Sequence, residues 1–454
     1  MIARKVLTTF SVFAFVLVTL LPAEAQRGRG RGIPLIRDAE IEALINDYTR
    51  PILKAAGLRR SAIEIYLVND NTFNAFVAGR RMFIHAGAIL LSETPNEIIG
   101  VIAHEIGHVV GGHHQRLAQQ VRRANLVAGF ATLLGAGVAV AGGLAGNSQV
   151  TGAGAGVAAG GQYQAITGLL RYQRAEERAA DLAATRFLSK TGQSGKGMLA
   201  TFQRFAENLS IQGGRVNPYL QSHPMPRERI QNLSTIVKKS KFYNRMDPKQ
   251  LQERHDLARA KIAAYLGSRR QAVAILNSKK VSPLARQYGQ AIVTHLYGSP
   301  RRAVPQINAL IKKRPKYAYF HEMKGEILLR SGKPKQAVAP FRRAVRLDKT
   351  GAGFLRVELG HALLESGGRK NTREAVKHLK RGLASDPNAV VGYRYLAGAL
   401  GELGDVSGAL LATAEGYFRS GHRKEAKQFA HRAQKNLKRG SPGWLRAQDI
   451  ITYK

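Results

Sequence analysis

The 454-residue sequence contains no cysteine, so it can form neither a disulfide nor a thiolate metal site, and a lipid anchor on an N-terminal cysteine is excluded. Acidic residues are scarce: 30 Asp and Glu stand against 70 Lys and Arg, a formal net charge of +40. Only 7% of the chain is aromatic, but 44% is hydrophobic, which is typical of a globular protein. At this length two domains are expected rather than one core.

The N-terminus has the pattern of an export signal. Arg4 and Lys5 precede an apolar run from Val6 to Leu21, and Ala23-Glu24-Ala25 provides a small-residue cleavage site. The apolar run is short for a membrane span. We therefore predict a cleavable signal peptide at residues 1–25 and a periplasmic protein, with an uncleaved anchor as the alternative.

The basic excess is concentrated in the second half of the chain. Residues 241–454 carry 43 Lys and Arg against 15 Asp and Glu, whereas residues 1–240 carry 27 against 15. A field of this sign attracts anionic partners. Because an export signal argues against nucleic acid, we predict no nucleic-acid partner and expect anionic envelope polymers such as lipopolysaccharide as counterions.

A stretch from Asn125 to Leu170 has no charged side chain and is rich in Gly and Ala. It is either a membrane-inserted hairpin or a mobile, Gly-rich helical pair packed on the preceding domain. Glycine weakens helices, and the flanks lack the aromatic anchors of membrane spans. The packed helical pair is therefore preferred, and contact with a membrane surface is left open.

Hydrophobic periodicity before this stretch predicts a helix, two strand-rich stretches and a second helix, at residues 37–57, 62–70, 74–90 and 94–114. A turn is expected at Gly79, and Thr94 and Pro95 suit the start of the second helix. From about residue 250 a different pattern recurs, in which a helix end, a glycine turn and a new helix follow one another. The turn glycines are spaced by 34, 36 and 36 residues, at Gly298, Gly332, Gly368 and Gly404. This is the period of tetratricopeptide (TPR) repeats, with another helical solenoid as the alternative.

The segment "HEIGHVVGGHH" contains a metal-binding pattern. On a helix, His104 and His108 project from one face, so both imidazoles can bind one metal ion. Glu105 lies beside them and is able to reach a metal-bound water. Histidine ligands with a free coordination position suit Zn²⁺. His113 and His114 fit a polar helix end better than a second metal site, and packing is the expected role of His85.

A third ligand must be His, Glu or Asp, because cysteine is missing. Glu177 could complete the site while Asp181 orients a ligand histidine. Alternatively, Glu176 and Glu177 pair with neighbouring arginines on a solvated helix face. The residues alone leave this open, with His113 and His114 as competing ligands.

The combined motifs resemble the gluzincin metallopeptidases of the HtpX and CAAX-prenyl-protease type. In that family the third ligand is the Glu of an R-x-x-E-x-x-A-D pattern, which Arg174, Glu177, Ala180 and Asp181 match here, with Gln173 where serine is usual. The stretches "NAFVAGRRMFIHAGAIL" and "SHPMPRERI" resemble the family's Asn-Ala-Phe strand and its His-Pro…Arg motif. The resemblance covers nearly everything after residue 35.

The resemblance implies an α+β zincin-like metalloprotease domain at residues 26–245, mostly helical with a small sheet, followed by an all-α TPR solenoid at 250–454. It implies a metalloendopeptidase with one Zn²⁺ per chain, held by His104, His108 and Glu177, with Glu105 as the catalytic base. We expect an extended peptide substrate to lie along an edge strand at Asn74, Ala75 and Phe76.

Two prolines keep the stretch "QSHPMPRERI" out of a helix, which suits a loop across a cleft. His223 in this loop can fill the fourth position of zinc, and the resemblance points to such a regulatory cover; a turn cap is the alternative. Arg229, also expected to serve substrate binding, steadies either the loop or the reacting carbonyl, and the sequence does not decide.

For an exported member with C-terminal repeats, the resemblance implies degradation of misfolded or stalled outer-membrane proteins and assistance to outer-membrane β-barrel assembly. The repeats would bind unfolded or stalled envelope proteins, or the β-barrel assembly machinery itself. The alternative is a TPR adaptor or chaperone in which proteolysis is minor.

Overall fold

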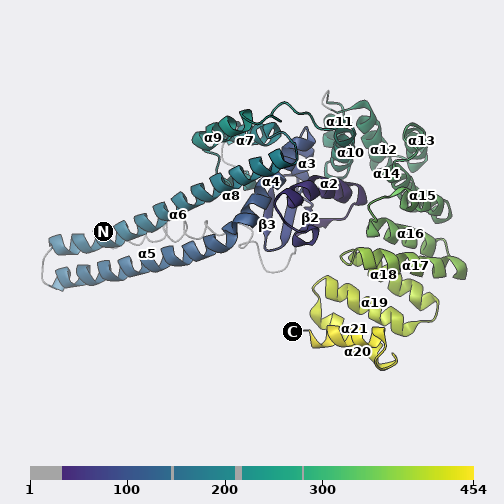
Figure 1. Ribbon diagram of the computed structural model, residues 1–454. Helices are drawn as coiled ribbons and strands as arrows, with labels where there is room; N and C mark the ends of the chain where they lie inside the picture. Colours follow the sequence, from purple (N-terminus) through teal and green to yellow (C-terminus); the bar gives the residue numbers. More distant parts are fainter. Residues whose placement is uncertain (1–32, 145–147, 210–216, 279–280, 454) are drawn as a thin grey trace. The chain divides into compact units, whose positions relative to one another are not determined.

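The computed structural model describes residues 33–144, 148–209, 217–278 and 281–453, and the predicted signal peptide at 1–25 lies outside them (Figure 1). The described residues form two compact units. Unit 1 contains the segment ending at Ile36 and Thr49–Met246, and unit 2 contains Arg37–Tyr48 and Asp247–Lys454. The domain limits expected from the sequence, at residues 26–245 and 250–454, stay predictions. By its contacts between Cα atoms, Arg37–Tyr48 belongs to unit 2, which contains the repeats.

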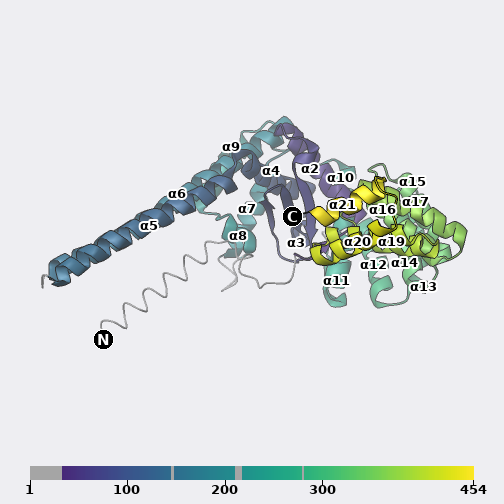
Figure 2. The same ribbon diagram turned by 90° about the horizontal axis from the view of Figure 1, so that it is seen from below.

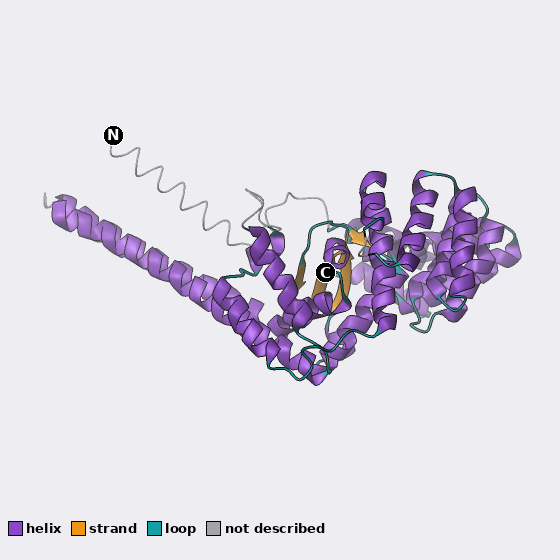
Figure 3. Ribbon diagram, turned by 90° about the horizontal axis from the view of Figure 1, so that it is seen from above, coloured by secondary structure: helices purple, strands orange, loops and turns teal. Residues whose placement is uncertain are grey.

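Unit 1 holds one small mixed sheet, and helices make up most of the rest of it (Figure 3). The strand order is β1-β2-β4-β3, with bounds β1 Leu35–Ile36, β2 Glu64–Val68, β3 Ala75–Ala78 and β4 Arg81–His85. β2 pairs parallel with β4, while β1 and β3 pair antiparallel with β2 and β4. The predicted turn at Gly79 has a φ of 64°, a conformation that favours glycine. β3 therefore lies at an edge of the sheet.

Eight α-helices accompany the sheet among the described residues: α2 Ala39–Ala55, α3 Ala86–Leu91, α4 Pro95–Gly111, α5 His113–Leu144, α6 Ser148–Lys190, α7 Lys196–Leu209, α8 Pro218–Ser222 and α9 Arg227–Lys238. A 3-10 turn, η2, spans Arg60–Ala62. The sequence assigned residues 86–90 to a strand-rich stretch, but they begin α3 instead. The helix predicted at 94–114 ends earlier, because Gly112 adopts a φ of 64° and α5 begins after it.

Helix α4 forms the centre of unit 1 and is buried from Pro95 to His108. Two of its glycines permit close packing. A Cβ at Gly100 would lie 2.4 Å from the Cβ of Met198 on α7, and one at Gly107 would lie 2.8 Å from the carbonyl oxygen of Ala180 on α6. Since side chains at these positions would push the helices apart, glycine brings the motif histidines on α4 against α6.

Helices α5 and α6 form a long antiparallel pair (Figures 1 and 2). The helical pair was predicted, but its packing on the preceding domain was not found, since most described side chains between Leu126 and Leu170 are exposed. Gln115–Val140 is, among the described residues, the one helix long and apolar enough to cross a membrane by length and composition. Only 6% of its apolar window is buried.

Unit 2 consists of successive helices that pack in pairs: α10 Lys249–Leu266, α11 Arg269–Leu276, α12 Pro283–Tyr297, α13 Pro300–Lys313, α14 Ala318–Arg330, α15 Pro334–Leu347, α16 Gly353–Glu365, α17 Arg369–Ser385, α18 Val390–Glu402, α19 Val406–Arg419, α20 Arg423–Lys435 and α21 Pro442–Thr452. Three of the four predicted turn glycines, Gly332, Gly368 and Gly404, have positive φ angles and separate the two helices of a pair. Large apolar side chains such as Phe341 and Leu379 face inward. The predicted all-α repeat architecture is confirmed.

The first half of α2 packs into unit 2 through charged groups. Glu40 is buried and accepts hydrogen bonds from the hydroxyls of Tyr288 and Tyr317, at 2.9 and 2.6 Å. Lys261 Nζ lies 2.7 Å from Asp38 Oδ2 and 3.3 Å from Glu40 Oε2. An N-terminal element therefore completes the interior of the repeat unit.

Candidate metal centre

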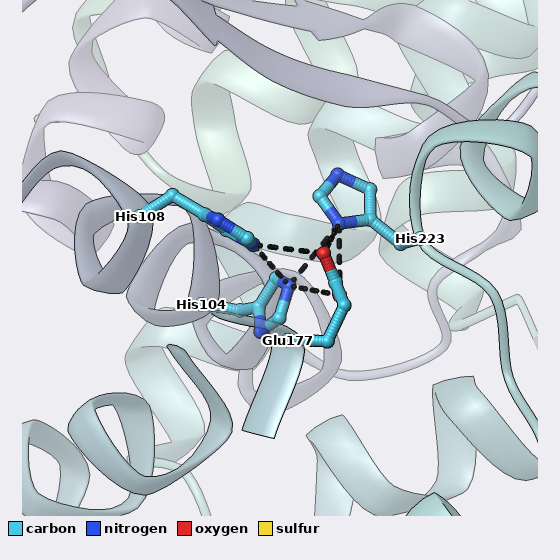
Figure 4. Close-up of side chains that lie close together, drawn as sticks. All are labelled: His104, His108, Glu177 and His223. Atoms are coloured by element: carbon cyan, nitrogen blue, oxygen red, sulfur yellow. Dashed lines mark hydrogen bonds and ion pairs between the residues drawn. The ribbon is translucent and has the colours of Figure 1, made fainter. Parts of the chain in front are cut away.

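Four potential ligands from three segments converge in unit 1 (Figure 4). His104 and His108 come from α4, Glu177 from α6, and His223 follows α8. One ligand atom of each residue lies within 4.8 Å of the others, and all four side chains are buried. His104 Nε2 is 3.0 Å from His108 Nε2, 3.3 Å from His223 Nδ1 and 3.3 Å from Glu177 Oε2.

This donor set fits a zinc ion. Tetrahedral zinc with Zn–N bonds of about 2.0–2.1 Å separates neighbouring ligand atoms by about 3.3 Å, close to the separations here. The nitrogens of His104 and His108 point at each other, and two lone pairs at this distance repel unless a cation or a proton lies between them. Three imidazoles and one carboxylate are also ligands that Zn²⁺ prefers.

The two glutamates that the sequence left open lie in different surroundings. Glu177 Oε1 is 3.3 Å from His108 Nε2 and 3.0 Å from His223 Nδ1, inside the cluster. Glu176 Oε2 instead lies 2.7 Å from His113 Nε2 and 3.0 Å from Arg116 Nη2. The structure thus brings Glu177 to the candidate metal position and pairs Glu176 elsewhere.

Asp181 and Arg229 form a buried layer behind the ligands. Asp181 Oδ1 lies 2.9 Å from His104 Nδ1, which leaves the other ring nitrogen, Nε2, free to face the metal position. Arg229 donates to both carboxylate oxygens of Asp181, at 2.7 and 2.9 Å, and lies 2.7 Å from Glu177 Oε2. It also donates to the carbonyl oxygen of Pro224 at 3.0 Å. These contacts favour the loop-steadying role over direct substrate binding.

The buried charges shift the pKa values of the ligands in opposite directions. Burial lowers the pKa of His104, but Asp181 and Glu177 outweigh burial and raise it to about 9. Burial lowers the pKa of His108 to about 3, so this ring is neutral and available as a ligand. The pKa of Glu177 lies well below its usual value: burial would raise it, but His223 and hydrogen bonds from the histidines outweigh that effect. A metal ion therefore competes with a proton mainly at His104.

Glu105 is buried beside the cluster on the side of His223. Its Oε1 lies 3.4 Å from His223 Nε2, and neither carboxylate oxygen has a hydrogen bond within the described part of the chain. Burial raises the pKa of Glu105, which makes this carboxylate a stronger base than an exposed one. A carboxylate so placed can take a proton from a water molecule in the site.

His113 has a role that the sequence analysis missed. It was interpreted as part of a polar helix end, but it is buried, with Nδ1 2.9 Å from His108 Nδ1 and Nε2 2.7 Å from Glu176 Oε2. If His113 donates to Glu176, its Nδ1 accepts from His108 Nδ1, and His108 Nε2 keeps its lone pair for the metal. The left-handed Gly112 turns the chain so that this contact forms, and helical spacing alone could not indicate it.

The predicted substrate residues lie at the edge of the sheet. Asn74 and Ala75 are buried, and Phe76 stacks on Phe83 with ring centroids 5.0 Å apart. Among the described strands β3 pairs with β4 alone, so its other edge can accept a strand. His85, expected to pack, is buried at the end of β4 with Nδ1 3.1 Å from Thr72 Oγ1. The side chain of His114 lies outside the described residues.

A cavity of about 500 Å³ opens next to Glu177. Helices α6 and α8, the loop after His223 and the start of α9 line it with Leu170, Gln173, Arg174, Glu177, Arg178, Leu220, Pro224, Met225, Pro226, Glu228 and Arg229. Its exposed lining is mainly apolar and includes several charged groups, which is typical of a site for a peptide side chain.

Comparison with known proteins agrees with this geometry. Residues 36–237 match peptidase family M48, and residues 298–352 match a tetratricopeptide repeat. The chain is 24% identical over 417 residues to the β-barrel assembly-enhancing protease of Escherichia coli (strain K12), covering 90% of this chain and 82% of that protein. It is 32% identical over 178 residues to metalloprotease YcaL of the same strain, covering 39% and 63%.

Among solved structures, YrrB, a TPR protein with an unusual peptide-binding site, aligns with a TM-score of 0.31 and 17% identity, covering 38% of this chain and 89% of that chain. The repeats are therefore identified by the chain's own helix pairs and by the family match rather than by this structure. The matched ranges contain every candidate ligand, Glu105 and the predicted edge strand. The chain is a metalloendopeptidase in which a peptidase family M48 domain precedes C-terminal tetratricopeptide repeats, and it is similar over most of its length to the β-barrel assembly-enhancing proteases.

Proposed function

We propose that the protein is a periplasmic zinc-dependent endopeptidase that degrades misfolded or stalled outer-membrane proteins and assists β-barrel assembly. The observation that carries the proposal is the buried cluster of His104, His108, Glu177 and His223, with the carboxylate of Glu105 beside it, which has no hydrogen bond among the described residues. The name of the similar E. coli protease supports the substrate class. The predicted signal peptide supports export to the periplasm.

One zinc ion, held by His104, His108 and Glu177, would polarise the scissile carbonyl and activate a water molecule. Asp181 holds His104, and the Glu176–His113 pair holds His108, so that both rings present Nε2 to the same point. Glu105 takes the proton of the attacking water and passes it to the leaving amine. The ring of Phe202, 5.6 Å from that of His104, helps to keep bulk water from this layer.

The substrate would add to the sheet as a further strand. β3 offers main-chain groups along its free edge, and the buried Asn74 Oδ1 has no hydrogen-bond partner among the described residues, so it can accept from a peptide N–H. The cavity next to Glu177 would receive a side chain of the substrate. Main-chain recognition of this kind suits a protease that acts on many unfolded sequences.

His223 would act as a reversible cover of the metal. Its Nδ1 lies 3.0 Å from Glu177 Oε1 and its Nε2 3.4 Å from Glu105 Oε1, so the ring occupies the space that water and substrate need. The following Pro224 is bound through its carbonyl to Arg229, which keeps the loop closed. We expect His223→Ala to raise the hydrolysis of casein several-fold with zinc retained. A fall in hydrolysis with zinc retained would instead assign His223 to transition-state stabilisation.

The repeats would bind unfolded or stalled envelope proteins, or the β-barrel assembly machinery. The rival function is an adaptor or chaperone that acts through the repeats. Glu105→Gln distinguishes the two, because it removes the base and leaves all proposed ligands in place. We expect this variant to keep zinc and bound partners, to lose casein hydrolysis by at least a hundredfold, and to fail in cells lacking the wild-type gene. Full rescue by the inactive variant would favour the adaptor.

A further inference from the structure

The helices α5 and α6 contact each other through small residues, and most of the pair's large apolar side chains are exposed. At the interface, a Cβ on Gly135 would lie 2.4 Å from the carbonyl oxygen of Gly154, and one on Gly161 would lie 2.0 Å from the Cβ of Ala131. The two backbones therefore approach too closely for larger side chains. Such an interface of small residues is how helices pack in lipid, where burying large apolar groups between them brings no gain.

The outward positions of α5 carry the large side chains. Leu126 is 62% exposed, Phe130 65% and Leu133 72%. Further exposed apolar residues are Val127, Leu134, Val138, Val140 and Leu144 on α5, and Val157, Tyr163 and Leu170 on α6. By helical spacing, those on α5 cover about half of its circumference, on the side away from the small-residue interface. A water-soluble helix pair has the opposite arrangement.

Charge and length agree with a lipid environment. The pair has no charged side chain from Asn125 to Leu170. The 20 residues of α5 from Asn125 to Leu144 span about 30 Å, the thickness of a bilayer's hydrocarbon core. The connection at residues 145–147 adds no charge that would have to cross the bilayer.

Arginines mark one end of this charge-free segment. The ion pair between Arg116 and Glu176, and the contact of Ala131 with Gly161, fix the register of the two helices. In this register, Arg122 and Arg123 of α5 lie level with Arg171 of α6. Guanidinium groups gathered at this level can bind lipid phosphates.

We propose that the hairpin α5–α6 inserts, tip first, into a lipid bilayer with anionic headgroups, with these arginines at the headgroup level. Both helices enter the bilayer from the same side, on which the rest of unit 1 lies. Glu177 follows Arg171 by six residues of α6, about 9 Å along the helix axis, so the candidate metal centre lies close to the membrane surface. The proposed insertion does not depend on the proposed function. If the protein is also a protease, a metal centre at this position would favour substrates at the membrane, and only this consequence rests on the proposed function.

Flotation with vesicles tests the insertion. We expect the full protein, as the cell processes it, to float with vesicles of phosphatidylglycerol and phosphatidylcholine. The double substitution Phe130→Glu and Leu133→Glu changes outward side chains and should reduce the floated fraction at least tenfold. Val406→Glu, at another exposed apolar position in α19, is the matched control and should float like the wild type. Casein hydrolysis shows that each variant is folded, and it distinguishes failure of this proposal from failure of the protease function.

Insertion depth separates a buried hairpin from surface attachment. The only native tryptophan, Trp444, belongs to unit 2. In Leu133→Trp a second tryptophan would lie about 15 Å beyond Arg123, near the bilayer centre, and lipids brominated deep in their chains should quench it. The wild type should show no such quenching. An active protein that does not float would overturn the proposal, and so would flotation that high salt abolishes and that leaves the new tryptophan unquenched. Equal flotation of the double variant and the wild type would also contradict it.

Discussion

The two ends of helix α6 have opposite surroundings. From Ser148 to Leu170 the helix has no charged side chain, and its hairpin exposes large apolar groups. From Arg171 to Lys190 it buries two carboxylates, Glu177 and Asp181, among imidazoles and a guanidinium. Apolar groups in water and charges in a protein interior are both costly. The proposed metal centre and the proposed membrane insertion give each end an environment that suits it: a metal cation at one end and lipid at the other.

Among the residues that hold a ligand in place, the largest effect is expected from Asp181→Ala. This change leaves His104 without the acceptor on Nδ1 and leaves Arg229 buried without its main partner. We expect zinc affinity or casein hydrolysis to fall about 10–100-fold, as is usual for partners of metal ligands. Metal titration and initial rates measure both. The exposed Glu64→Ala on β2 is the control and should change neither; unchanged values in Asp181→Ala would reduce Asp181 to a packing residue.

A smaller effect is expected from His113→Ala. It removes the group that fixes His108 and leaves Glu176 paired with Arg116. We expect zinc affinity to fall about tenfold, at the lower end of the range for residues that hold a metal ligand, because the other ligand histidine, His104, stays bound to Asp181. Competition with a zinc chelator measures the change. His113→Gln keeps a hydrogen-bonding side chain and should recover part of the affinity. If neither variant alters zinc affinity, the contact with His108 has no role in the site.

Unit 2 also buries carboxylates, but there Lys261 of the chain itself, rather than a metal ion, pairs with Glu40 and Glu322. Burial raises the pKa of Glu358 to about 8, from an ordinary value of 4.5. The folded state then holds a proton that the unfolded state has lost, so the free energy of unfolding falls as pH rises from about 4.5 to 8. The slope is at most about 1.4 kcal/mol per pH unit for one group.

Glu358→Gln should remove this slope and make unit 2 more stable than wild type at pH 8, but not at pH 4.5. Urea unfolding at the two pH values measures it. Glu365→Gln, at a more exposed position of the same helix α16, is the control and should leave the slope unchanged. If Glu358→Gln keeps the wild-type slope, another group carries the pH dependence.

Local spacing explains which features could be predicted from sequence. His104 and His108 lie four residues apart, so they share a helix face in any fold that makes this segment a helix. The repeat period likewise predicted the helix pairs of unit 2. The choice of Glu177 over Glu176 needed the family pattern, since both lie on one helix. By contrast, the contact of His113 with His108 depends on the turn at Gly112, and the membership of Arg37–Tyr48 in unit 2 depends on tertiary partners such as Lys261.

The charge-free segment shows the same limit. Its helical pair was predictable from the sequence, but the side that each residue presents was not, because Gly, Ala and large apolar residues alternate without a single apolar stripe. The register that brings Gly135 against Gly154 decides which side chains face outward. Packing of the pair on the preceding domain was expected because glycine weakens helices and the flanks lack aromatic anchors, whereas the close backbone contact between the two helices cannot be recognised from residue order.

The most direct test of the account is zinc content measured together with casein hydrolysis in two neighbouring variants. Glu177→Ala removes a proposed ligand, whereas Glu176→Ala, one position away on α6, removes a carboxylate that pairs with His113 and Arg116. We predict one zinc ion per wild-type chain, loss of zinc and of hydrolysis in Glu177→Ala, and retention of both, with at most about a tenfold decrease in zinc affinity, in Glu176→Ala. Full zinc occupancy and hydrolysis in Glu177→Ala would contradict the proposed metal centre.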